Sequence, residues 1–317
     1  MKTVARTPTR RAAATAERAP SARQKHVLPP LLGAHVSTAG GVAMAVTRAV
    51  SIGCTAIQLF VKNNMQWFAP APFGSEELRG FHEHEKRSEL KTVFGHSGYM
   101  INLAATNPQF LAKSRQALEE ELRRAAQLDL PFLVLHPGAH MGAGIEAGLR
   151  RVIESLDAVF ARLGPVTTRV ALEITAGQGS CLGCTFEQLD FILRNVRESE
   201  RLCVCLDTAH LFAAGYDLRT AKGTESVFNA FDKIVGRKHL AALHLNDSKT
   251  AFGSKVDRHE HIGQGQIGLD AFRYIMNAPR FLQIPKVLET PKGKEMLEDI
   301  ANLKTLRELR SEVRIKR

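Results

Sequence analysis

Metal-binding residue types recur along this chain, each at or just after the end of a short apolar run. The set is His35, His96, His136, Glu173, Asp207, His210, His244 and Glu289. Imidazole and carboxylate ligands without thiolates favour zinc, manganese or iron, and sites that catalyse reactions keep one coordination position open for water. A single Asp or His at such a position is more often a salt-bridge partner, a cap or a hydrogen-bonded polar group. The repetition along the chain is what indicates a metal site.

Two further candidates, Asp257 and His259, lie on either side of Arg258, in the long segment after the run at residues 240–245. In an extended segment, side chains at positions i and i+2 point to the same side. These two side chains could therefore hold one ion together.

The apolar runs alternate with amphipathic helical stretches about every 25 to 40 residues, which is typical of repeated βα units. Most runs are continuous rather than alternating, as expected for parallel strands that are covered on both faces. We predict eight strands, at residues 31–35, 56–60, 92–95, 132–135, 169–173, 202–206, 240–245 and 286–289. No linker interrupts the alternation, so the predicted fold class is α/β, a single (β/α)8 TIM barrel.

The helix expected after the third strand shows the pattern well. Asn107 can cap its start, and Pro108 suits its first turn. Its apolar residues recur on one face, at Leu111, Leu118, Leu122 and Ala125. We expect that face to pack on the barrel.

In a barrel of this kind the carboxyl ends of all strands meet on one face, where active sites are found. Residues far apart in the sequence would therefore form one polynuclear metal cluster there. Three divalent ions against four carboxylates, Glu173, Asp207, Asp257 and Glu289, would leave about +2, which attracts a phosphate. A cluster of two or three metals with a bridging hydroxide would suit in-line attack on a phosphodiester.

The charge of the chain is uneven. The formal net charge is +11, and residues 1–25 hold seven Lys or Arg and one Glu, so they carry six of these eleven charges. We interpret residues 1–28 as a disordered basic tail, with an organelle transit peptide as the alternative, and residues 29–317 as the barrel domain. The positive charge suits a polyanionic partner as well as simple solubility.

No run of 18 or more apolar residues is present, so we expect no membrane association. Five cysteines are too few, and odd in number, for a disulfide framework. Both features favour an intracellular protein in a reducing compartment, and we expect it to be cytoplasmic and nucleoid-associated. The single CxxC pair, Cys181 and Cys184, has no second pair to complete a zinc ribbon, and His82 and His84 are expected to lie exposed on a charged helix.

From Gly33 to Pro291 the sequence resembles the endonuclease IV family of apurinic/apyrimidinic endonucleases. The similarity is carried by GAHVSTAGG, YMINLA, LHPGAH, LEITAGQG, LDTAHLFAAGYDLRT, LHLNDSK, FGSKVDRHEHIGQGQIG and VLETP. The resemblance implies a monomer that cleaves double-stranded DNA on the 5′ side of abasic sites, leaving a 3′ hydroxyl and a 5′ deoxyribose phosphate. It also implies trimming of blocked 3′ ends.

The resemblance also implies three zinc ions, with manganese as an alternative at one or more positions. The first ion would be bound by His96, His136 and Glu173, and the second by Glu173, Asp207, His244 and Glu289. The third would be bound by Asp257, His259 and His210. Glu173 would be the catalytic residue, since it would share two ions and position the hydroxide between them. His35 is expected to line the pocket or to hydrogen-bond a ligand.

The DNA-binding residues implied by the resemblance are Met65, Gln66, Tyr99 and Met100. Met65 stands where the family often has a basic side chain, and with Trp67 it could form an apolar wedge or simply pack within the loop. Ile174 replaces the usual Asn or Thr, and Gln264 replaces the usual Glu or Lys. Because side chains around a metal site form hydrogen bonds that orient its ligands, these two replacements could change how the ligands are oriented.

Two other functions remain open from the sequence. A sugar isomerase or epimerase shares the barrel and often binds one or two divalent ions, but it usually has no need of the third set, His210, Asp257 and His259. A nucleic-acid-binding protein that has lost catalysis is the second alternative, although every ligand is present here.

Overall fold

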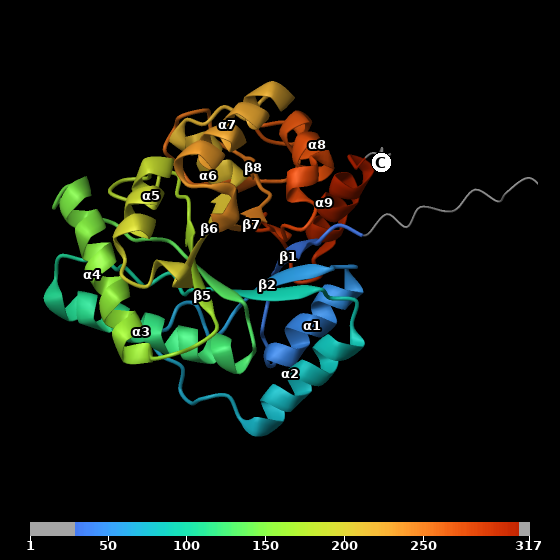
Figure 1. Ribbon diagram of the computed structural model, residues 1–317. Coiled ribbons are helices and arrows are strands. Elements are labelled where there is room, and N and C mark those ends of the chain that lie inside the picture. Colours follow the sequence, from blue (N-terminus) through green and yellow to red (C-terminus); the bar gives the residue numbers. More distant parts are fainter. Residues whose placement is uncertain (1–28, 311–317) are drawn as a thin grey trace, which may run out of the picture.

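The computed structural model describes residues 29–310, which form a closed eight-stranded parallel barrel surrounded by helices (Figure 1). The barrel order is β1-β10-β7-β6-β5-β4-β3-β2. The strands are β1 Leu32–Val36, β2 Ala56–Phe60, β3 Thr92–His96, β4 Phe132–Leu135, β5 Arg169–Glu173, β6 Leu202–Asp207, β7 Leu240–His244 and β10 Lys286–Leu288. The fold class predicted from the sequence is confirmed.

Helices pack around the outside of the barrel (Figure 1). They are α1 Val42–Ser51, α2 Ser75–Arg87, α3 Pro108–Gln127, α4 Ile145–Leu163, α5 Phe186–Asn195, α6 Thr208–Ala214, α7 Ala221–Ile234, α8 Leu269–Asn277 and α9 Leu297–Glu308. Short 3-10 turns form at η1 Ser199–Arg201, η2 Arg237–His239 and η3 Pro279–Phe281. Among residues 29–310, no helix is both long enough and apolar enough to span a bilayer.

All eight predicted strands are present, and their ends differ from the prediction by one residue at most. Glu289 lies one residue beyond β10, and β7 ends at His244. The structure adds a small antiparallel pair, β8 Asp247–Ser248 with β9 His259–Glu260. Strands of two residues are too short to show any periodicity in the sequence. The predicted basic tail, residues 1–28, lies outside the described residues, so the domain boundary at residue 29 stays a prediction.

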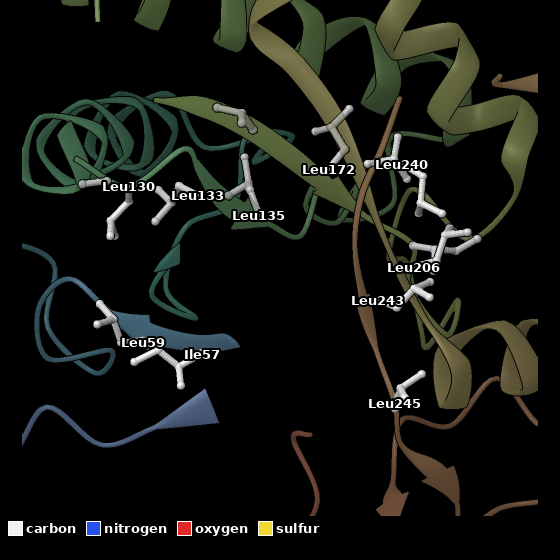
Figure 2. Close-up of a cluster of buried hydrophobic side chains, with 14 of the residues drawn as sticks. Ile57, Leu59, Leu130, Leu133, Leu135, Leu172, Leu206, Leu240, Leu243 and Leu245 are labelled. Atoms are coloured by element: carbon white, nitrogen blue, oxygen red, sulfur yellow. The ribbon is translucent and has the colours of Figure 1, made fainter. Parts of the chain in front are cut away.

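The hydrophobic core has two parts. The larger part lies between the barrel and its helices, and Figure 2 shows some of it, including Leu133, Leu135 and Leu172. The smaller part lies on the opposite face of the same strands. It consists of Phe94, Phe132, Val134, Ala171, Cys203, Cys205, Ala242 and Val287. Successive residues of a strand point to opposite faces, so this second set fills the barrel interior.

Helix α3 forms as its sequence predicts. The Asn107 side chain accepts hydrogen bonds from the backbone N–H groups of Gln109 and Phe110, and Pro108 occupies the first turn. Leu118, Leu122 and Ala125 are buried against the barrel, whereas Leu111 is only partly buried.

Candidate metal centre at the mouth of the barrel

The candidate ligands on the strands continue the inward-facing row of side chains by one step. Side chains two positions apart on a strand face the same side. Each ligand lies two positions after a residue of the barrel interior: His96 after Phe94, His136 after Val134, Glu173 after Ala171, Asp207 after Cys205, His244 after Ala242 and Glu289 after Val287. The strand register places neighbours side by side, as with Asp207 on β6 and His244 on β7. Polar side chains therefore replace apolar ones in the last inward-facing layer, at the carboxyl end of the barrel.

Glu173 lies at the centre of this layer and is fully buried. Its Oε2 atom lies 3.2 Å from His96 Nε2 and 3.0 Å from His136 Nε2. Its Oε1 atom lies 3.0 Å from His244 Nδ1 and 3.2 Å from His210 Nδ1. Its two oxygens thus face different imidazoles, and Glu173 belongs both to the set with His96 and His136 and to the set with Asp207, His244 and Glu289, so it can serve two neighbouring metal positions.

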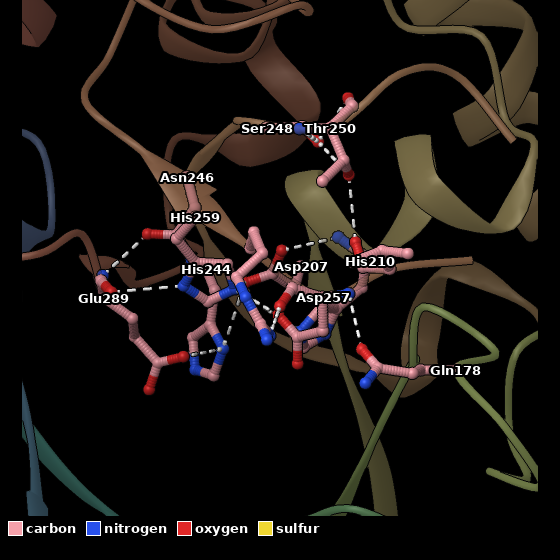
Figure 3. A network of polar contacts seen from close by, with 12 residues as sticks. Gln178, Asp207, His210, His244, Asn246, Ser248, Thr250, Asp257, His259 and Glu289 are labelled. Atoms are coloured by element: carbon pink, nitrogen blue, oxygen red, sulfur yellow. Dashed lines mark hydrogen bonds and ion pairs between the residues drawn. The ribbon is translucent and has the colours of Figure 1, made fainter. Parts of the chain in front are cut away.

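A second group lies between α6 and the loop that follows β8. His210 Nε2 lies 3.1 Å from Asp257 Oδ2, and His259 Nε2 lies 3.4 Å from Asp257 Oδ1. The two histidine Nε2 atoms lie 3.4 Å apart, and His259 Nε2 lies 3.7 Å from Asp207 Oδ2. Figure 3 shows these side chains pointing toward one another from separate segments.

The candidate ligand atoms form three compact sets, in each of which they lie within 4.8 Å of one another. The sets are His96, His136 and Glu173; Asp207, His210 and His259; and Glu173, Asp207, His244 and Glu289. Asp257 extends the second set through its contacts with both histidines. The structure therefore brings together all nine residues that the family resemblance implies as ligands.

Four of the histidines have one ring nitrogen held by a backbone carbonyl or by an amide side-chain oxygen. His96 Nδ1 lies 2.7 Å from the carbonyl of Ser97, His210 Nδ1 lies 2.9 Å from that of Ile174, and His259 Nδ1 lies 3.1 Å from that of Glu289. His244 Nε2 lies 2.8 Å from the side-chain oxygen of Gln58. An oxygen acceptor requires the N–H form of that nitrogen, so the other nitrogen can offer a lone pair to a metal.

Three carboxyl groups of the cluster, those of Glu173, Glu289 and Asp257, have pKa values below their usual range. Burial raises the pKa of Glu173, but His244 and His136 outweigh this effect and hold that pKa well below its usual value. Burial raises the pKa of Glu289 as well, and His244 and His35 hold it well below its usual value. Burial also opposes ionisation of Asp257, yet the hydrogen bond from His210 lowers its pKa to about 2. Buried anions that face imidazoles form the N/O donor set that zinc and manganese prefer.

Sequence reasoning missed two residues that support the cluster. Gln58 is fully buried; its amide nitrogen donates to Glu289 Oε1, and its amide oxygen faces His244. Asn246 donates to Asp207 Oδ2 and accepts from the backbone N–H of Glu289, 2.7 Å away. Gln58 could have been noticed, because it interrupts the apolar strand AIQLF.

His35 makes the contact expected of it, since its Nδ1 atom lies 3.2 Å from Glu289 Oε1. Burial lowers its pKa to about 4, so the imidazole is neutral. Its ring packs against Phe60, with 4.2 Å between the ring centroids.

The four residues expected to contact DNA lie on two loops at the same end of the barrel. Met65 and Gln66 are exposed in the loop after β2, and Met65 is 69% exposed. Tyr99 follows β3 and lines a cavity of about 400 Å³ together with His96, His136 and His210. Tyr99 and Met100 also line a neighbouring groove of about 790 Å³. Trp67 packs against Phe110 and the core, which supports ordinary loop packing for that residue.

The departures from the family pattern lie where they disturb little. Ile174 is buried among apolar side chains, and only its backbone carbonyl contacts His210. Gln264 is exposed on the loop after β9. Cys203 and Cys205 are buried in the barrel interior, and burial raises the pKa of Cys203 to about 12, so its thiol stays protonated.

Fold and site together define a metal-dependent TIM-barrel enzyme. A family described as "Xylose isomerase-like TIM barrel" matches residues 46–308. A "Probable endonuclease 4" of Chloroflexus aurantiacus is 46% identical over 280 residues, covering 88% of this chain and 98% of the relative. The crystal structure of endonuclease IV from Thermus thermophilus superposes with a TM-score of 0.78 at 35% identity, covering 88% of this chain and 98% of that one. The chain belongs to the endonuclease IV family and is a nuclease.

A D-tagatose 3-epimerase-like protein also superposes, with a TM-score of 0.65 at 17% identity, covering 88% of this chain and 96% of that one. At that identity the likeness shows the fold alone. It explains why a sugar isomerase or epimerase was a reasonable alternative from the sequence.

Proposed function

We propose that the protein is a DNA-repair endonuclease that hydrolyses the phosphodiester 5′ to abasic sites in double-stranded DNA. The products would be a 3′ hydroxyl and a 5′ deoxyribose phosphate, and the same site would trim blocked 3′ ends. One observation carries the proposal: eight candidate metal ligands converge with Glu173 at the mouth of a barrel whose sequence relatives are endonucleases. A monomer suffices, because every residue of the cluster comes from one chain.

We assign the cluster to three zinc ions, with manganese as the alternative. His96, His136 and Glu173 would bind the first ion, and Glu173, Asp207, His244 and Glu289 the second. His210, Asp257 and His259 would bind the third, with Asp207 close to it. The fit rests on the donors: the carboxyl groups of Glu173, Glu289 and Asp257 have lowered pKa values, and four imidazoles have one nitrogen held by an oxygen acceptor, so that the other can face a metal. When bound, such ions stabilise charge on a phosphoryl oxygen and make water a strong nucleophile at neutral pH.

The chain's own residues would position the reacting groups. Glu173 is our candidate catalytic residue, because its two oxygens face two imidazole pairs and can orient the attacking water between them. Tyr99 stands exposed at the edge of the cavity, where it can contact the damaged nucleotide. Met65, Gln66 and Met100 would contact the DNA around it.

The alternative of a sugar isomerase is disfavoured by the group around Asp257. Sugar isomerases of this barrel type use one or two ions, whereas His210, Asp257 and His259 supply a further set of donors beside them. The sequence relatives named as endonucleases point the same way.

The decisive experiment is cleavage of a labelled duplex that contains one tetrahydrofuran abasic analogue, before and after removal of metal with a strong chelator. The analogue cannot undergo β-elimination, so a cut on its 5′ side requires hydrolysis. We expect metal-dependent incision that returns when zinc or manganese is added. Folded, metal-loaded protein that leaves this duplex intact would overturn the proposal and favour the isomerase.

A further inference from the structure

A buried ion pair lies beneath the two loops that we expect to contact DNA. Lys62, two residues after β2, and Glu121, in the middle of α3, lie 2.9 Å apart (Nζ to Oε1). Their side chains are only 3% and 0% exposed. The pair is separate from the candidate metal ligands and has no part in the chemistry described above.

Lys62 fixes the loop after β2 from within. Its ammonium donates to the backbone carbonyl of Gln66 and to that of Asn63, 3.4 Å away, in addition to Glu121. An ammonium has three donor hydrogens, so these three acceptors use all of them. The segment that they bracket, residues 63–66, contains Met65 and Gln66.

Glu121 fixes the loop after β3. Its carboxylate accepts from the backbone N–H of Gly98, with Oε2 at 3.0 Å and Oε1 at 3.3 Å. Gly98 passes so close that a Cβ atom there would lie 3.1 Å from Lys62 Nζ and 3.2 Å from Glu121 Oε1. Tyr99 and Met100 follow directly, and the Tyr99 ring packs on Phe60 at the end of β2.

Helix α3 holds the remainder of the first loop through neighbouring residues. Glu120 accepts from the backbone N–H of Ala69 at 2.7 Å. Arg124 donates to the carbonyls of Val61 and Ala71 at 2.7 and 2.9 Å. One face of α3 therefore sets the path of the first loop, and Glu121 joins that loop to the second.

Stability alone does not explain the pair. Burial raises the pKa of Glu121, and Lys62 only partly opposes this effect. A buried ion pair often adds nothing to stability compared with packed apolar side chains of similar size. Its contribution is geometric, because each charged group binds the backbone of a different loop.

We propose that Lys62 and Glu121 are positioning residues that hold the loops bearing Met65–Gln66 and Tyr99–Met100 in one fixed relation, so that both present a preformed surface to damaged DNA. The inference rests on the proposed function for the identity of the ligand. Preorganised loops lower the entropic cost of binding. Loss of the link should therefore weaken DNA binding more than it slows the chemical step.

The test is the double variant K62M/E121M in the full, metal-loaded protein. It removes both charges, so neither is left unpaired, and it fills the space with unbranched apolar side chains. We expect a thermal midpoint lowered by only a few degrees, because the buried Gly98 N–H loses its acceptor, and a KM for the abasic duplex at least about fivefold higher, with kcat within about twofold. Amide hydrogen exchange should speed up together at residues 63–67 and 98–100.

The matched control is R280M/D232N. This pair, with 2.6 Å between Arg280 and Asp232, joins α7 to η3 and contacts neither loop. We expect it to keep the wild-type KM and loop exchange. If K62M/E121M does not fold, K62M/E121Q also leaves no charge unpaired, and its amide oxygen can still accept from Gly98, so only the link to the first loop is lost and exchange should speed up at residues 63–67 alone.

Unchanged exchange in the two loops, or the same change in the control, would overturn the inference. Exchange needs no DNA, so it separates this inference from the proposed function. If exchange speeds up in the loops of K62M/E121M but the wild type never cuts abasic DNA, the link between the loops is upheld and the proposed function is rejected. If the wild type cuts abasic DNA but loop exchange is unchanged in K62M/E121M, the proposed function is supported and the link between the loops is rejected.

Discussion

Gln58 accepts a hydrogen bond from His244, with 2.8 Å between Gln58 Oε1 and His244 Nε2. The same amide donates to Glu289, so one buried side chain fixes two candidate ligands of the second metal position. This contact fixes the proton on His244 Nε2 and leaves Nδ1 facing Glu173. The orientation of the metal site therefore depends on a residue that carries no charge and would bind no metal.

We predict that Gln58→Leu lowers metal affinity about 10- to 100-fold, because outer hydrogen bonds orient the ligands. The measurement is competition with a chromophoric chelator, followed by metal analysis of the purified protein. Gln127→Leu, on the exposed end of α3, should leave the affinity unchanged. Equal affinities of wild type and Gln58→Leu would show that His244 is held without the amide.

Glu173→Gln should abolish incision while DNA binding stays largely intact. Removal of this anion leaves two imidazole pairs without their shared partner, whereas the loops that would contact DNA are not altered. Binding to a tetrahydrofuran duplex by fluorescence anisotropy, together with cleavage of the same duplex, measures both effects. Persistent cutting would remove Glu173 from its catalytic role. Wild-type binding without any incision in either protein would favour a DNA-binding protein that has lost catalysis.

Ile174→Val should lower stability by about 0.5 to 1.5 kcal/mol, the usual cost of one methylene in a packed core. Metal affinity should stay at the wild-type value, since Ile174 contacts His210 through its backbone carbonyl. Urea unfolding and chelator competition on the same samples check both parts. A fall in metal affinity without a fall in stability would contradict the interpretation that the Ile174 side chain packs in the core and does not orient His210.

Lys286 should make stability depend on pH. Burial lowers its pKa from 10.5 to about 7, and its ammonium donates to the backbone carbonyls of Phe281 and Ile284. Between these pKa values the unfolded chain holds the proton and the folded chain releases it, so stability rises with pH by up to about 1.4 kcal/mol per pH unit. The rise begins near pH 7 and is absent below it.

The check compares wild type with Lys286→Met by urea unfolding at several pH values from 6 to 9. The difference between the two free energies of unfolding should grow in favour of the wild type above pH 7. A constant difference across this range would mean that the carbonyl acceptors keep Lys286 charged.

The barrel and the identity of the candidate ligands could be predicted because their signals are local. Apolar runs and helical periodicity depend on neighbouring residues. Along a strand, every second side chain faces the same side, so each inward-facing ligand lies two residues after an inward-facing apolar residue, as His96 lies after Phe94. The resemblance in motifs such as LEITAGQG then implied how the residues divide among ions.

Only the tertiary structure decided how distant segments meet. Gln58 reaches His244 because closure of the barrel brings β2 and β7 to one interior, although 186 positions separate them in the chain. The carbonyl of Ile174 and the link between Lys62 and Glu121 depend likewise on strand register and helix placement. A hydrogen bond requires atoms within about 3 Å, and sequence periodicity fixes the face of an element but not such distances between elements.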